Sequence, residues 1–130
     1  MAITSYRDLE AWQLADDLRW RIIAFTARAP ARTDGRFCSG IRDAVGSVCR
    51  NLAEGFERYH HRQFAFFVRV ALGSLGETDD QLEEAYQRGY LSPAELDELR
   101  RLGQRARLTL KGLLRHLTRS EAPRRPGGQA

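Results

Sequence analysis

The spacing of apolar residues constrains the fold of this chain most, because they recur every three or four positions over four long stretches. That period matches one face of an α-helix, and no stretch shows the strict alternation of a half-buried strand. We therefore predict helices at about residues 7–28, 36–58, 63–88 and 93–120. Long helices joined by short connections predict an all-α fold, an antiparallel up-down-up-down four-helix bundle.

Residues that start or stop helices support these bounds. Pro30 is expected to end the first helix, because a proline forces the residue before it out of helical geometry. Gly89 suits the left-handed position that closes the third helix. Ser92 precedes a proline and is followed three residues later by Glu95, which predicts a capping box at the start of the fourth helix. Ser5 and Asp8 have the same spacing before the first helix.

Composition indicates a single globular domain. The chain has 130 residues, of which 42% are hydrophobic and 29% charged, so it can bury one core unaided. We assign residues 1–120 to the bundle and residues 121–130, a stretch of prolines, glycines and arginines, to a disordered basic tail. No apolar stretch approaches 18 residues and the first residues are charged, so we expect neither a membrane partner nor a signal peptide.

The two cysteines indicate the compartment. Cys38 and Cys49 lie eleven positions apart in one predicted helix, which separates them by roughly 16 Å. A disulfide needs Cα atoms within about 7 Å, so these thiols cannot join each other. Unpaired thiols fit a reducing environment, and we expect a cytoplasmic protein.

Catalytic patterns are missing from the sequence. A di-metal site in a four-helix bundle needs two Glu-x-x-His pairs, and only Glu57 and His60 have that spacing. There is no glycine-rich phosphate loop and no nucleophile elbow. We expect no catalytic residue, no metal, no cofactor and no enzymatic activity.

The fourth helix carries most of the basic character of a chain with net charge +4. Its arginines and lysine fall four apart over part of their length, so they share a face off the leucine stripe. Such a stripe can follow a phosphate backbone. The alternative is that acids of the third helix, such as Asp79 and Glu83, pair with these cations. The candidate nucleic-acid-binding residues are Arg100, Arg107, Lys111, Arg115 and Arg119.

Two further groups of residues concern the interior. Asn51, Glu54, Ser74 and Glu77 form a candidate polar cluster between the second and third helices, which we interpret as structural rather than ligand-binding. Gly55, Gly73 and Gly76 lie within predicted helices, where glycine is unfavourable, and this suggests that neighbouring helices approach closely there.

Short motifs give the chain a family resemblance. Residues 6–13 (YRDLEAWQ), 51–56 (NLAEGF), 71–77 (ALGSLGE) and 89–91 (GYL) occur in the order and spacing of the four-helix bundle proteins encoded in 23S rRNA intervening sequences. The chain resembles this family, also called the S23 ribosomal protein family, over residues 5–118. It departs from the family at residues 48–50 (VCR), where members often have a helical proline, so the proline kink is absent here.

The resemblance implies a four-helix bundle that assembles as a ring-shaped homopentamer. One branch of the family serves as the accessory protein of diversity-generating retroelements, which binds a reverse transcriptase and nucleic acid. Our leading hypothesis is a non-enzymatic homo-oligomer that binds RNA or DNA, with structured RNA favoured. The alternative is a protein–protein adaptor or scaffold that binds a protein partner and no nucleic acid.

Overall fold

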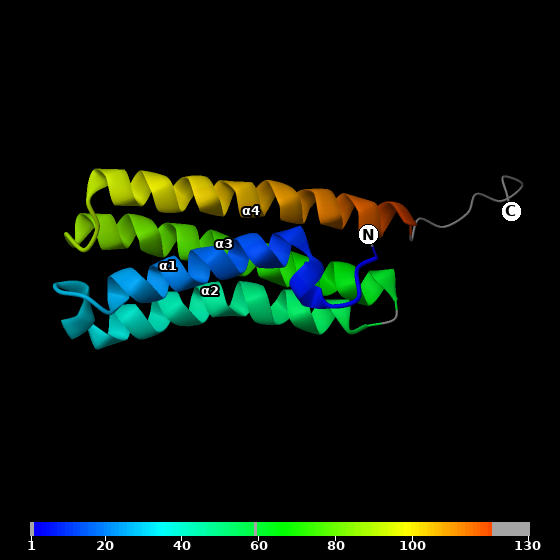
Figure 1. Cartoon of the computed structure of the whole chain (residues 1–130), viewed down its shortest axis with the longest axis horizontal. Coiled ribbons are helices and arrows are strands. Elements are labelled where there is room, and N and C mark those ends of the chain that lie inside the picture. Colours follow the sequence, from blue (N-terminus) through cyan, green and yellow to red (C-terminus); the bar gives the residue numbers. More distant parts are fainter. Residues whose placement is uncertain (1, 59, 121–130) are drawn as a thin grey trace, which may run out of the picture.

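Four long helices, α1 to α4, make up the protein in a computed structural model that describes residues 2–58 and 60–120 (Figure 1). α1 spans Glu10–Thr26, α2 spans Gly35–Phe56, α3 spans His61–Gln87 and α4 spans Pro93–Ser120. Two 3-10 turns, Tyr6–Asp8 and Ala31–Thr33, precede α1 and α2. No strand occurs among the described residues. The prediction of an all-α four-helix bundle is confirmed.

The helices run antiparallel in sequence order and form a four-cornered bundle. α1 packs against α2 and α4, and α3 packs against the same two helices. The turns α1–α2 and α3–α4 therefore lie at one end of the bundle, and the connection between α2 and α3 lies at the other (Figure 1). α4 ends at that second end, beside the beginning of α3.

Most predicted helix boundaries hold, and their caps have the expected geometry. The Ser92 hydroxyl accepts a hydrogen bond from the Glu95 amide, and the Glu95 carboxylate accepts one from the Ser92 amide. Gly89 has a φ of +82°, and the amide of Tyr90 bonds to the carbonyl of Ala85, as in a Schellman motif. The replacement of the family's proline at residues 48–50 leaves α2 continuous.

The start of α1 differs from the prediction. Ser5 and Asp8 do form a capping box, but it caps the first 3-10 turn rather than the α-helix. Leu9 then adopts an extended conformation and buries its side chain, so the α-helix begins at Glu10 instead of Arg7.

The core is the set of apolar stripes that the helical period predicts. Leu18, Ile22, Ile41, Leu75 and Leu110 are almost fully buried among them. Cys38 and Cys49 are both buried and free, as expected from their spacing. The predicted basic tail, residues 121–130, lies outside the described residues. Within the described part of the chain, no helix is apolar over a length that could cross a membrane.

Candidate nucleic-acid interface

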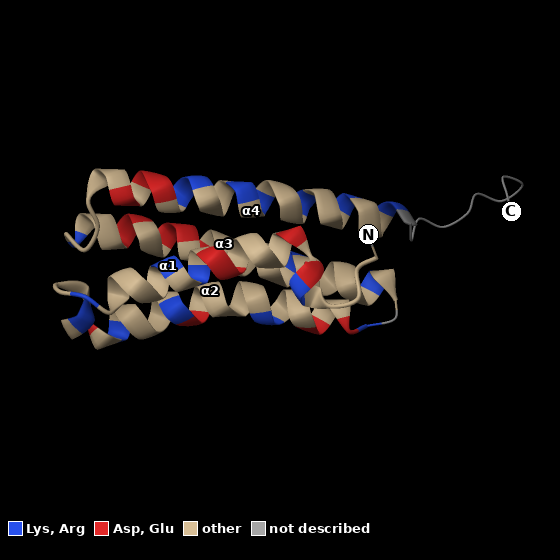
Figure 2. Ribbon diagram, viewed as in Figure 1, with Lys and Arg blue, Asp and Glu red and all other residues tan. Residues whose placement is uncertain are grey.

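α4 changes character along its length. Its acids, Glu95, Asp97 and Glu98, all lie in the first two turns, and residues 99–120 contain six arginines and one lysine but no acid. Figure 2 shows this order as acidic residues confined to the beginning of α4 and basic residues along the rest. The helix therefore has a mixed first part and a purely basic second part.

Ion pairs neutralise the first part of α4. Glu95 pairs with Arg28 of α1, and Glu98 pairs with Arg21 of α1 at 2.7 Å. Asp97 pairs with Arg101 of α4 itself, also at 2.7 Å. All the acids of the described helix are therefore engaged, and two of them fasten α4 to α1.

Arg100 belongs to this paired region although the sequence placed it with the nucleic-acid-binding residues. Its guanidinium lies 3.3 Å from a carboxylate oxygen of Asp79 and 3.0 Å from one of Glu83, both on α3. This contact is the pairing with acids of the third helix that the sequence left open. Arg100 consequently serves as a link between α3 and α4, and its donors face carboxylates.

The remaining candidates form an unpaired set, which we call the basic stripe: Arg107, Lys111, Arg115 and Arg119. Lys111, Arg115 and Arg119 are exposed and Arg107 is half-buried. Within the described chain, none of the four forms an ion pair. At four-residue intervals the stripe extends over about 18 Å of helix, and one strand of duplex nucleic acid presents about five phosphates over that length.

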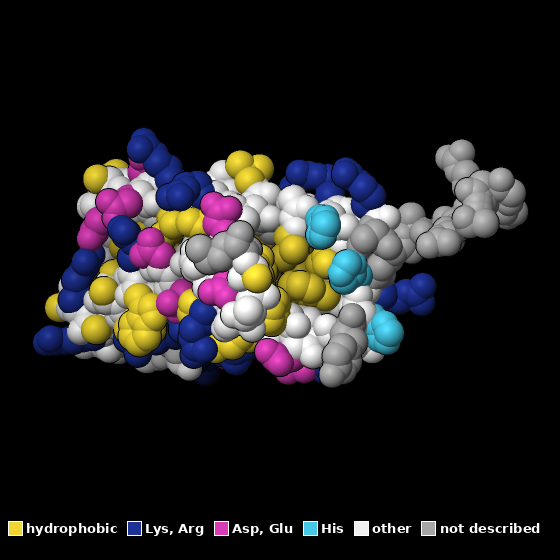
Figure 3. Space-filling view, turned by 45° about the vertical axis from the view of Figure 1, so that its right-hand side comes forward, with side chains coloured by type: hydrophobic (Ala, Val, Ile, Leu, Met, Phe, Trp, Pro, Cys, Tyr) yellow, Lys and Arg dark blue, Asp and Glu magenta, His cyan; other side chains and the backbone are white. Residues whose placement is uncertain are grey.

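Histidine side chains lie close to the basic stripe at one end of the bundle. Sequence reasoning did not predict this cluster. The imidazole ring of His61, the first residue of α3, lies 6.1 Å from that of His116 on α4, measured between ring centroids. Figure 3 shows the three histidine side chains of the protein gathered near one end, with arginine and lysine side chains beside them. The signal that could have revealed this cluster is topological, since an antiparallel hairpin brings the start of α3 beside the end of α4.

The predicted polar cluster forms only in part. Asn51 and Ser74 are connected through Ser47, whose hydroxyl lies 2.8 Å from that of Ser74 and accepts a bond from the Asn51 amide at 3.0 Å. Glu54 instead pairs with Arg58 on the surface, and Glu77 is exposed away from this contact. Ser47 is the member that sequence reasoning missed.

The prediction of close helix packing at the three helical glycines is also borne out only in part. A Cβ atom on Gly55 would lie 2.8 Å from the ring of Phe64 and 2.9 Å from the Cβ of Phe67, so close packing is confirmed there. A Cβ atom on Gly73 or Gly76 would meet nothing within 4 Å. The prediction that another helix of this chain approaches closely is therefore wrong for Gly73 and Gly76.

The described residues do not assemble a metal centre or an activated thiol. No group of three histidine, cysteine or acidic side chains among them could hold a metal ion. Burial raises the pKa of the Cys49 thiol to about 11, which disfavours the nucleophilic thiolate.

Comparison with protein families places the chain beside known sequences. The family model of the 23S rRNA-intervening sequence proteins matches residues 7–112. No curated protein matches the chain. The match covers α1, α2 and α3 completely and α4 as far as Gly112, so it includes the first half of the basic stripe and stops before Arg115.

Proposed function

We propose that this chain, which belongs to the family of 23S rRNA-intervening sequence proteins, is a non-enzymatic, homo-oligomeric bundle that binds structured RNA through the basic stripe of α4. The observation that carries the proposal is the contrast within α4. In its first part, Arg100 and Arg101 meet acids of α3 and of α4 itself, and the acids of α4 pair with arginines of α1. By contrast, Arg107, Lys111, Arg115 and Arg119 meet no acid in the described chain.

The chemistry of the stripe favours phosphates. Three of its members are arginines, whose planar guanidinium can donate two parallel hydrogen bonds to a phosphate. A straight row of cations on one helix reads a backbone rather than base edges, so binding would depend little on sequence. The affinity would fall steeply with salt because each neutralised phosphate releases counterions.

The binding experiment uses fluorescence anisotropy with a structured RNA, a DNA duplex and a single strand at about 50 and 200 mM salt. The test variant is Lys111→Gln with Arg115→Gln. The matched control is Arg100→Gln with Arg101→Gln, which removes the same charge from the same helix at sites that already face carboxylates.

We expect the test variant to bind RNA at least about tenfold more weakly and with a shallower salt dependence, while the control variant stays near the parent. Equal losses in both variants would mean that net charge alone governs binding, and the stripe would lose its role. A parent protein that binds none of the three nucleic acids at low salt would remove the proposal.

The oligomer is the second part of the proposal. The four cations of one chain form a small site, and several copies on one assembly would add their affinities through effective concentration. The resemblance implies a pentamer. Light scattering coupled to size exclusion would give five times the 14.8 kDa of the chain, and a monomeric mass would contradict this part.

Exposed apolar side chains support the alternative function, a protein–protein adaptor. The side chains of Trp20 and Phe66 are each 58% exposed, and Val70 lies one turn after Phe66 on the same face of α3. Aromatic residues of this kind dominate the energy of protein interfaces. The adaptor would be favoured if the parent binds none of the nucleic acids but captures a protein encoded beside it, and Phe66→Ser abolishes that capture with the mass unchanged.

A further inference from the structure

A second set of arginines lies at the opposite end of the bundle from the end of α4. A surface groove of about 590 Å³ follows the end of α1 and the first half of α2, and its lining includes Thr26, Arg32, Ser39 and Arg42. This volume falls in the range of small-molecule sites. The groove shares no residue with the basic stripe.

Arg42 is held in place from inside the protein. Its Nε donates a hydrogen bond of 2.8 Å to the hydroxyl of Thr26, which is 1% exposed. That hydroxyl in turn donates to the carbonyl of Ile22 at 2.7 Å, so its orientation is fixed by the end of α1. One edge of the guanidinium is therefore anchored, and the two terminal nitrogens make no hydrogen bond or ion pair with the described residues.

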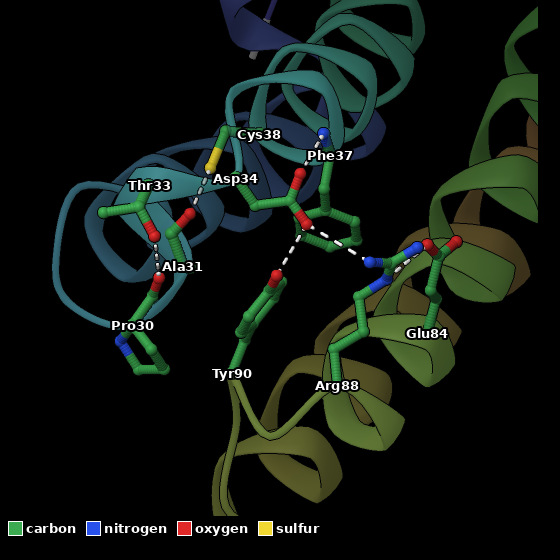
Figure 4. A network of polar contacts seen from close by, with 9 residues as sticks. All are labelled: Pro30, Ala31, Thr33, Asp34, Phe37, Cys38, Glu84, Arg88 and Tyr90. Atoms are coloured by element: carbon green, nitrogen blue, oxygen red, sulfur yellow. Dashed lines mark hydrogen bonds and ion pairs between the residues drawn. The ribbon is translucent and has the colours of Figure 1, made fainter.

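The neighbouring acids are already engaged. Asp43 on the rim of the groove pairs with Arg50 at 3.0 Å, about two turns further along α2. Asp34 points to the α3–α4 turn, where Tyr90 and Arg88 bind its carboxylate (Figure 4). Arg32 has no ion pair within the described chain. Two guanidinium groups thus share a groove whose lining acid, Asp43, is already paired with Arg50.

We propose that this groove binds a phosphate monoester. The fixed guanidinium of Arg42 would donate two hydrogen bonds to the phosphate, because an anchored planar fork loses little freedom on binding. Arg32 would supply the second positive charge for a dianion, and the exposed hydroxyl of Ser39 a further donor. The groove is open at its surface, so the rest of the ligand can be either a small phosphorylated molecule or the terminal phosphate of a nucleic acid strand.

The test is an NMR titration of the ¹⁵N-labelled full chain with inorganic phosphate, adenosine monophosphate, and an oligonucleotide with and without a 5′-phosphate. Sodium chloride at matched ionic strength serves as the reference. We expect saturable shifts of the Arg42 Nε–H resonance and of the amides around Arg32 and Ser39. A preference for the phosphorylated oligonucleotide over adenosine monophosphate would assign the strand end as the source, and the reverse would assign the small molecule.

Two variants separate the site from general charge. Arg42→Gln should weaken phosphate binding about tenfold or more, and Thr26→Val, which removes only the anchoring hydroxyl, should weaken it by a smaller factor. Arg69→Gln, an exposed arginine of α3 outside the groove lining, is the control and should bind like the parent. Backbone spectra of each variant verify the fold.

The inference is overturned if chloride produces the same shifts, or if Arg42→Gln binds phosphate as tightly as Arg69→Gln does. Because the titration reads resonances at the α1–α2 end, its outcome does not depend on whether the basic stripe of α4 binds RNA. Loss of RNA affinity in the Lys111→Gln and Arg115→Gln variant, with phosphate binding intact, would show two separate anion sites.

Discussion

The hydroxyl of Tyr90 donates a hydrogen bond of 2.5 Å to the carboxylate of Asp34, across 56 positions of sequence. The other oxygen of Asp34 accepts from the amide of Phe37 and thereby caps α2. Arg88, at the end of α3, lies 3.3 Å from the same carboxylate that Tyr90 binds (Figure 4). One side chain thus begins a helix and fastens the α3–α4 turn to the α1–α2 turn.

Replacing Tyr90 with phenylalanine should destabilise the protein. The ring would still pack against Phe37, from which its centroid lies 5.3 Å, but the carboxylate would lose its shortest hydrogen bond. The midpoint of urea unfolding should fall. Tyr86→Phe is the matched control because Tyr86 is exposed and its hydroxyl has no hydrogen bond in the described chain. Equal midpoints for the two variants would argue against a stabilising role for the bond.

Stability should fall in acid because of the same carboxylate. The pKa of Asp34 lies below its ordinary value of 3.8, first because Tyr90 donates to it and then because the Phe37 amide does. The folded state therefore holds this proton less tightly than the unfolded chain. The contribution of the Asp34 carboxylate to the stability of the folded state is complete above about pH 4, and it is lost as the pH falls through the lowered pKa.

Tyr90 should limit stability at the alkaline side. Its pKa is raised above 10.0, chiefly because its hydroxyl is bonded to the Asp34 carboxylate. Here the stabilisation is complete below about pH 10 and is lost as the pH rises through the raised pKa.

Urea unfolding over a pH series checks both the acid limb and the alkaline limb of the curve of stability against pH. Asp34→Asn should flatten the acid limb.

Two helical glycines should respond oppositely to alanine. Gly55→Ala should destabilise by about 1–3 kcal/mol, because the Cβ of Phe67 belongs to the next helix and cannot rotate away. Gly73→Ala should stabilise by about 0.5–1 kcal/mol, since alanine favours the helix and meets no neighbour. Thermal unfolding measures both. If Gly73→Ala lowers stability only at concentrations where the protein oligomerises, Gly73 contacts another copy.

Cys49 should react slowly with thiol reagents. Its side chain is buried and its pKa is about 11, so at pH 8 little thiolate exists in the folded protein. In a Cys38→Ala background, the rate of modification by a disulfide reagent should rise with urea and follow the opening of the structure. Rapid labelling without denaturant would contradict the packing of α2 against α1 around this residue.

Helix positions could be predicted from sequence because local signals agree with the fold. Ser92, Pro93 and Glu95 specify the start of α4 within a single turn, and Gly89 specifies the end of α3. Leu9 could not be predicted, because its extended geometry depends on a burial position that only the assembled bundle creates.

The candidate site was less accessible to sequence reasoning. A four-residue spacing grouped Arg107, Lys111, Arg115 and Arg119, but it could not reveal that Arg100 meets Asp79 and Glu83. That contact depends on the axial register of α3 against α4, which no local pattern encodes. The link between Asn51 and Ser74 through Ser47 depends on register in the same way.

The uneven charge of α4 also affects the free protein. Glu95 lies in the first turn of α4 and Arg119 in its last. Each charge is therefore opposite in sign to the nearby end of the helix macrodipole, which is positive at the start and negative at the end, and this arrangement is favourable. Each well-placed charge of this kind stabilises a helix by about 0.3–1 kcal/mol at low salt. The arginines of the last turns are therefore tolerated without any ligand. A phosphate bound at Arg119 would have to compete with the carbonyl end of α4, whereas Lys111, two turns earlier, has no such competitor.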